Sequence, residues 1–213
     1  MDKILFANQL SYLSSLRNLP DQLIIEMEEF AKMNKIPILD WKAAELLDQL
    51  IIIHKPKKVL EIGTAIAYSS IRIARLLKKK ANIDTIEKSA DNIVLANEFI
   101  KRADLESKIN LIHGEALDLL PQLHKKYDLI FLDADKKDYE KLFYYSLMLL
   151  KKKGVIVVDN LLWHGYAGAS KVPSEYKTSA KQIRDFNKLF LSQNNLVSTI
   201  LPVGDGIGIG IKL

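Results

Sequence analysis

The chain of 213 residues contains no cysteine. Disulfide bonds, thiolate metal sites and cysteine nucleophiles are therefore excluded, and any bound metal must be held by oxygen or imidazole. A run of 18 or more apolar residues is also lacking, and the segment from Met1 to Asn8 carries an acidic residue and no signal-like apolar stretch. We therefore expect a cytoplasmic protein with no membrane partner.

Charge is only slightly unbalanced, with 31 Lys and Arg against 26 Asp and Glu and a net charge of +5. A basic excess favours phosphate-rich partners such as nucleic acids if it is clustered. The lysine runs at 78–80 and 151–153 fall where helices are expected to end, and lysine stabilises a helix C-terminus whatever the function. Composition alone therefore leaves nucleic-acid binding and a general compositional bias equally open.

The order of elements predicts one α/β domain over residues 1–213, and the 48% hydrophobic content is enough to build its core. Residues 1–55 read as a helical segment, and 56–213 alternate short β-rich runs with helical patterns, as in a parallel sheet covered on both faces. The expected helices are Lys3–Leu16, Asp21–Asn34, Asp40–His54, Tyr68–Lys79, Asp91–Ala103, Ala116–Leu123 and Tyr139–Leu150. The expected parallel strands are Val59–Ile62, Ile83–Ile86, Ile109–His113, Leu129–Leu132 and Val155–Val158.

The last part of the chain differs, because strands are expected at Val197–Leu201 and Ile207–Ile211 with a Gly-rich turn between them. This is hairpin chemistry, so an antiparallel pair should complete a mostly parallel seven-stranded sheet. The segment Trp163–Lys177 is the longest irregular stretch and a candidate active-site loop.

The run from Val59 to Ser69 reads as a strand, a glycine turn and a helix start. Gly63 would let backbone approach a ligand, and the helix N-terminus with Ser69 suits a carboxylate. The G-x-G-x-x-G pattern of dinucleotide sites is absent. Glu61 at the strand tip would repel a pyrophosphate but can bind an amino group, so the pattern favours a cofactor that carries an amino acid.

Further candidates follow the next two strands. Glu87 ends the second strand, where an acid can accept both ribose hydroxyls. Glu115 and Ala116 follow the third, where an acid and a small residue can meet an adenine edge. Singly each is an ordinary loop or cap residue, and the signal is their placement on successive strand ends.

Asp133 and the pair Asp159-Asn160 end two strands that should be adjacent, about 4.8 Å apart. Three oxygen donors across that gap suit Mg²⁺, and Mn²⁺ or Ca²⁺ would also fit. Acidic residues that begin a loop are the structural alternative.

With these residues the chain resembles class I S-adenosylmethionine-dependent methyltransferases, and more closely the cation-dependent O-methyltransferases of catechol and caffeoyl-CoA type. The family pattern E-x-G-x-x-x-G-Y-S is present from Glu61 to Ser69, with Ala67 at the second glycine, although alanine disfavours a positive φ. The resemblance covers nearly the whole chain and implies the Rossmann-like class I methyltransferase fold with S-adenosylmethionine as cofactor. It also implies that Asp133, Asp159 and Asn160 are the metal ligands.

The resemblance adds two further roles. Lys136 matches the family's general base, which a neighbouring metal would help to keep deprotonated. Leu39 matches a residue over the cofactor, and Asp133 is a further candidate for the cofactor amino group. By their position in the sequence, Asp135 and His164 are alternative candidates to Lys136. For both of them an ordinary loop role is the simpler interpretation.

Within the family the chain looks most similar to compact bacterial enzymes that methylate 5-hydroxyuridine at the tRNA wobble position. The likeness lies in 36–39, in 159–165 and in 201–206. It implies binding of the tRNA anticodon region, a homodimer, and phosphate contacts that we assign to Lys171, Lys177, Lys181 and Arg184. The alternatives are a small-molecule catechol-type O-methyltransferase and a non-catalytic cofactor- or RNA-binding domain.

Overall fold

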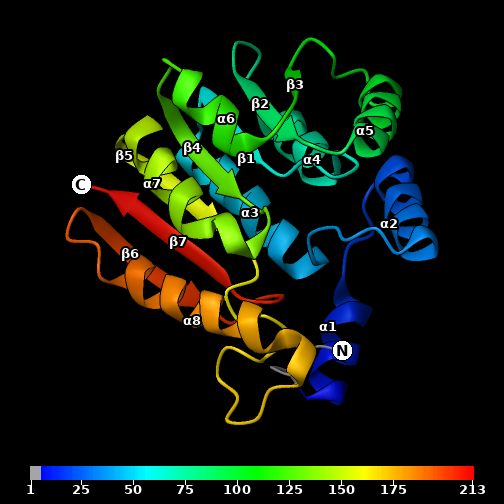
Figure 1. Ribbon diagram of the computed structural model, residues 1–213. Coiled ribbons are helices and arrows are strands. Elements are labelled where there is room, and N and C mark those ends of the chain that lie inside the picture. Colours follow the sequence, from blue (N-terminus) through cyan, green and yellow to red (C-terminus); the bar gives the residue numbers. More distant parts are fainter. Residues whose placement is uncertain (1–5) are drawn as a thin grey trace.

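The computed structural model describes residues 6–213, so the predicted start of the first helix at Lys3 lies outside the described residues. One sheet of seven strands forms the centre in the order β3-β2-β1-β4-β5-β7-β6 (Figure 1). The strands are β1 (Lys58–Ile62), β2 (Asn82–Glu87), β3 (Ile109–His113), β4 (Tyr127–Leu132), β5 (Leu150–Val158), β6 (Leu196–Leu201) and β7 (Ile207–Lys212). Strands β1 to β5 run parallel, and β7 pairs antiparallel with both β5 and β6, which confirms the predicted sheet.

Helices cover both faces of this sheet (Figure 1). They are α1 (Ala7–Leu16), α2 (Gln22–Asn34), α3 (Trp41–His54), α4 (Tyr68–Leu76), α5 (Ala90–Arg102), α6 (Ala116–Leu119), α7 (Tyr139–Leu149) and α8 (Lys177–Leu191). Single 3₁₀ turns occur at Leu120–Gln122, Lys136–Asp138 and Ser174–Tyr176. Within residues 6–213 no helix has the length and apolarity needed to cross a bilayer.

Successive strand residues alternate between two separate cores. Leu129 and Phe131 of β4 pack with α2 to α5, whereas Ile130 and Leu132 pack with α7 and α8. Neighbouring side chains of a strand point to opposite faces, so a strand buried on both sides must be apolar at nearly every position. This is why the parallel strands read as continuous apolar runs.

The structure corrects several predicted boundaries. Helix α4 ends at Leu76 rather than Lys79, and the expected helix over 116–123 is α6 followed by a 3₁₀ turn that contains Pro121. Strand β5 begins at Leu150, where the pattern predicted the end of a helix. Helix α8 was absent from the predicted elements, although Ala180, Ile183, Phe186 and Phe190 give it a buried stripe at helical spacing.

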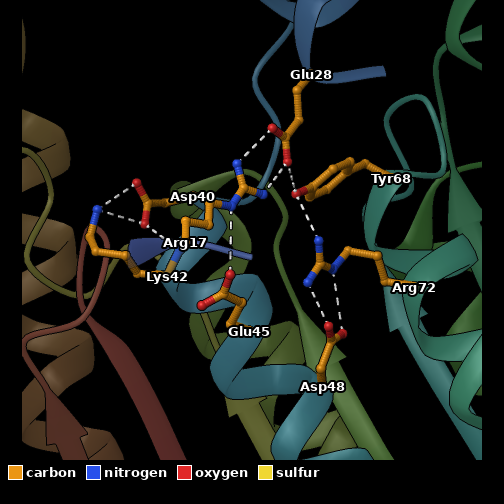
Figure 2. Close-up of polar contacts among 8 residues, drawn as sticks. All are labelled: Arg17, Glu28, Asp40, Lys42, Glu45, Asp48, Tyr68 and Arg72. Atoms are coloured by element: carbon orange, nitrogen blue, oxygen red, sulfur yellow. Dashed lines mark hydrogen bonds and ion pairs between the residues drawn. The ribbon is translucent and has the colours of Figure 1, made fainter. Parts of the chain in front are cut away.

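A polar network joins the N-terminal helices to α4 (Figure 2). Arg17, just after α1, donates to both carboxylate oxygens of Glu28 in α2, at 2.9 and 2.7 Å. The hydroxyl of Tyr68 donates to the same carboxylate at 2.7 Å. Arg72, which donates to Tyr68, also pairs with Asp48 of α3. Burial opposes the charge of Glu28, but its hydrogen bonds outweigh this and hold its pKa below the usual range.

We expect Arg17→Ala to lower the free energy of unfolding by roughly 2 kcal/mol, because it leaves Glu28 without its bidentate partner in a site where the two side chains are 13% and 25% exposed. The matched control is Arg75→Ala, whose pair with Asp21 is 32% and 51% exposed. Such a surface pair contributes less than about 1 kcal/mol. Urea unfolding of both variants checks this, and equal effects would contradict it.

Candidate active site

A cleft of about 810 Å³ opens where the parallel strands end. In open α/β sheets this edge is where ligands bind. The pairing register explains the location, since Gly63, Glu87, Asp133 and Asp159 end β2 or directly follow β1, β4 and β5. Of the predicted site residues, the cleft is lined by Gly63, Glu87, Glu115, Ala116, Asp133, Lys136, Asp159 and Asn160.

The loop after β1 requires positive φ values, which most residues disfavour. Gly63 has a φ of +99°, and a Cβ on it would lie 1.7 Å from the carbonyl oxygen of Asp133. The carboxylate of Glu87, predicted to meet a ribose, accepts the backbone N–H of Ala65 at 2.8 Å. Ala67 adopts a left-handed φ of 68° and is fully buried, so the chain keeps the conformation that usually favours glycine.

We expect Gly63→Ala to destabilise the protein by more than about 2 kcal/mol, because backbone rather than a flexible side chain blocks the new methyl group. Gly168→Ala is the control, since a Cβ added to Gly168 would have nothing within 4 Å of it. Thermal unfolding of the two variants measures the difference, and a Gly63→Ala protein as stable as the control would show that the loop can move away.

Glu61 lies behind the cleft wall rather than on it. It is fully buried and accepts hydrogen bonds from the hydroxyls of Ser69, Ser70 and Thr85. Burial raises its pKa to about 7, although these three hydrogen bonds favour the charged form. Glu61 and Ser69 therefore form a polar support beneath the loop of Gly63, and neither side chain lines the cleft.

The raised pKa of Glu61 makes stability depend on pH. Below about pH 4.5 this carboxyl is protonated in both states, and as the pH rises toward 7 only the unfolded chain loses the proton freely. Relative to Glu61→Gln, wild-type stability should fall by about 3 kcal/mol from pH 4.5 to 8. Urea unfolding across this range measures it. The exposed Glu106→Gln should not alter the wild-type profile, and parallel Glu61→Gln and wild-type profiles would refute the effect.

Besides Glu61 and Ser69, a third predicted cofactor contact, Leu39, also lies away from the cleft wall. The side chain of Leu39 is 5% exposed and packs in the core beneath α3 and α4, while Pro37 and Ile38 line the cleft. The sequence alone could not tell which of residues 37 to 39 face the cleft and which pack in the core.

Asp133, Asp159 and Asn160 meet at one corner of the cleft, as predicted. Burial, and after it the charge of Asp133, raises the pKa of Asp159 well above its usual range. The Lys136 ammonium lies in this corner, 2.6 Å from Asn160 Oδ1 and 3.5 Å from Asp133 Oδ1. It also donates to Tyr139, at 2.6 Å, whose hydroxyl in turn donates to the carbonyl of Asp159. Lys136 thus balances charge in this corner.

The corner suits a hard divalent cation. Two carboxylates and an amide oxygen are the donor types that Mg²⁺ prefers, and the mutual repulsion of Asp133 and Asp159 is what a cation relieves. Within residues 6–213 no group of three or more His, Cys, Asp or Glu side chains has the geometry of a metal site. Any site here therefore depends on the amide of Asn160 as its third protein ligand.

Sequence reasoning missed two residues of this corner, Tyr139 and Asp205. Tyr139 lies three residues after Lys136, a spacing that places side chains on one helical face. Asp205, in the turn between β6 and β7, comes from far along the chain and gave only a hairpin signal. Burial raises its pKa, and the backbone N–H of His164, which donates to Oδ1 at 2.6 Å, opposes this.

The loop that carries Asn160 is strained. Asn160, Trp163 and His164 have left-handed φ values of 60°, 47° and 56°. Trp163 and His164 are the central residues of a turn that the Gly165 N–H closes onto Leu162 O at 2.9 Å, as in a type I′ turn. Such turns favour Gly, Asn or Asp, and each bulkier residue costs about 1 kcal/mol or more.

The predicted RNA contacts are placed differently from one another. Lys171 is exposed in the loop that precedes α8, and Lys177 is exposed as the first residue of that helix. Lys181 forms an exposed ion pair with Asp185. Arg184 donates to the carbonyls of Tyr166, Ala167 and Ala169, so its guanidinium holds that loop in place. Asp135 is an exposed partner of Lys88, in line with an ordinary loop role.

Comparison with known proteins bears on this site. The model of a family described as O-methyltransferase matches residues 14–213. The chain belongs to this O-methyltransferase family.

Its relatives share most of its length. A catechol O-methyltransferase from Niastella koreensis is 34% identical over 177 residues, which cover 80% of this chain and 74% of the relative. A Staphylococcus aureus structure with the provisional name caffeoyl-CoA O-methyltransferase has a TM-score of 0.87 and 32% identity, over 97% of this chain and 98% of that one. A Bacillus cereus O-methyltransferase solved in complex with SAH has a TM-score of 0.82 and 27% identity, over 95% and 96%. The predicted family and fold are confirmed.

Proposed function

We propose that this protein is an S-adenosylmethionine- and divalent-cation-dependent O-methyltransferase whose substrate presents two neighbouring oxygens. The observation that carries the proposal is the corner of Asp133, Asp159, Asn160 and Lys136 in the cleft at the strand ends. The family relationship and the SAH-bound relative support the same assignment.

The roles of the chain's own residues follow from their chemistry. Asp133, Asp159 and Asn160 would hold the cation, which supplies a Lewis acid that stabilises a substrate oxyanion. A cation held in the corner would take over the charge balance that Lys136 provides, so that Lys136 could act as the neutral amine and take the proton of the substrate hydroxyl at Nζ. Tyr139 and Asn160 hold that nitrogen in place. The cofactor would supply the methyl group from its sulfonium, and the deprotonated substrate oxygen would receive it as the S–C bond breaks. Gly63, Glu87, Glu115 and Ala116 line the cofactor side.

For the substrate we propose 5-hydroxyuridine at the tRNA wobble position, where the 5-hydroxyl and 4-oxo groups are neighbours and could chelate a metal. Lys88, Lys136 and Lys137 line the cleft, and Lys171 in the loop before α8 and Lys177 at the start of α8 are exposed. Cations beside the cleft suit an RNA backbone. Arg184 donates to backbone carbonyls of this loop, and Lys181 pairs with Asp185. We therefore assign the phosphate contacts to Lys171 and Lys177.

A small-molecule catechol is the second candidate, and the relatives favour it. The Niastella koreensis protein is named as a catechol O-methyltransferase, and a catechol also offers two adjacent oxygens. A homodimer and a cytoplasmic location stay predictions, since the structure holds one chain.

Incubation with labelled S-adenosylmethionine, Mg²⁺ and either catechol or tRNA that carries unmethylated 5-hydroxyuridine decides between the substrates. Nucleoside analysis of the tRNA then identifies the methylated base.

Lys136→Ala should lower methyl transfer at least 100-fold, because it removes the general base, and EDTA should abolish methyl transfer. Lys152→Ala is the control, since Lys152 is exposed at the opposite end of β5. Transfer that survives both Lys136→Ala and EDTA would refute the mechanism.

In the same assay, replacing Lys171 and Lys177 together by alanine should weaken tRNA methylation and its dependence on salt while leaving catechol turnover unchanged. Efficient turnover of catechol with none of tRNA would establish the second candidate.

A further inference from the structure

The turn between β6 and β7 accepts three backbone N–H groups of the loop that carries Asn160. The N–H of Leu161 donates to Gly206 O at 2.9 Å, and the N–H of Leu162 donates to Asp205 O at 2.8 Å. The N–H of His164 donates to the Asp205 side chain at 2.6 Å. Through this last contact a side chain of the turn reaches the strained pair Trp163-His164.

The turn itself is firmly seated. A Cβ on Gly204 would lie 3.1 Å from Ala43 Cβ and 3.2 Å from Asp40 Cβ, both at the start of α3. A Cβ on Gly206 would lie 2.7 Å from the backbone nitrogen of Leu162. Both glycines have positive φ, so the turn lies tightly between α3 and the loop that follows β5. The turn is therefore closely packed on both sides, against α3 and against that loop.

We propose that Asp205 is a positioning residue for the corner of Asp133, Asp159 and Asn160. Through the His164 N–H it holds the strained loop that carries Asn160. The proposal rests on the proposed function only for its catalytic consequence. Left-handed Trp and His are retained only where surroundings enforce them, and Asp205 is well placed to do so. Its Oδ1 accepts the His164 N–H at 2.6 Å, and its Oδ2 lies 3.9 Å from His164 Nδ1. The Asn160 side chain also interacts with this carboxylate and favours its charged form.

Three variants of the 213-residue chain test this. Asp205→Ala removes the acceptor, whereas Asp205→Asn retains an oxygen for the His164 N–H and removes the charge. Asp128→Ala is the matched control, since the Asp128 carboxylate also accepts backbone N–H groups, from Lys57 and Lys58, at the opposite end of the sheet.

The readouts are hydrogen exchange of residues 160–167 without added metal, and Mn²⁺ affinity from electron paramagnetic resonance. Asp205→Ala should speed exchange in this segment and weaken Mn²⁺ binding roughly 10- to 100-fold, as loss of a residue that orients a ligand commonly does. Asp205→Asn should stay within about threefold of wild type in both, and Asp128→Ala should change neither.

Two results would overturn the proposal. One is unchanged exchange and Mn²⁺ affinity in Asp205→Ala. The other is Mn²⁺ binding lost equally in Asp205→Asn with exchange unaltered, because the carboxylate charge would then act on the cation directly. If wild type binds no Mn²⁺ the proposed function fails instead, and the exchange of the metal-free proteins still decides the positioning role.

Discussion

The in-register pairing of the parallel strands is the constraint on which the site depends. The ladder continues past the strand ends, since Gly63 N–H donates to Ile86 O, Asp133 N–H to Ile62 O and Asp159 N–H to Leu132 O. Residues far apart in sequence are thereby brought level at one edge. The strand ladder by itself therefore brings Gly63 and Glu87 level with Asp133 and Asp159.

A second constraint is electrostatic. The acidic corner is partly buried, and Lys136 lies within it as an internal counter-ion. Because Lys136 also bonds to Tyr139 at the start of α7, the charge balance of the corner is tied to helix packing. The N-terminal network likewise ties the start of α4 to α2, because Arg17 and Tyr68 both donate to Glu28. The starts of α4 and α7 are thus both fixed by polar contacts.

The parts predictable from sequence were those encoded locally. Apolar runs located the parallel strands, and the residues after them located Asp133, Asp159 and Asn160, because strand ends share one edge. Contacts between distant segments were not encoded this way. Asp205 approaches His164 only through the pairing of β7 with β5, and Arg184 turns inward because the loop before α8 offers it carbonyls. Helix α8 was not predicted because the charged residues of its exposed face separate the few apolar residues of its buried face in the sequence.

Ala67 carries a wider consequence. Its methyl group is completely buried, and burial of a methyl contributes about 0.8 kcal/mol, which offsets much of the cost of a left-handed alanine. The shape of the loop after β1 is thus kept by its neighbours rather than by the identity of one residue. A search pattern that insists on glycine would overlook this chain, whereas one written in dihedral angles would find it.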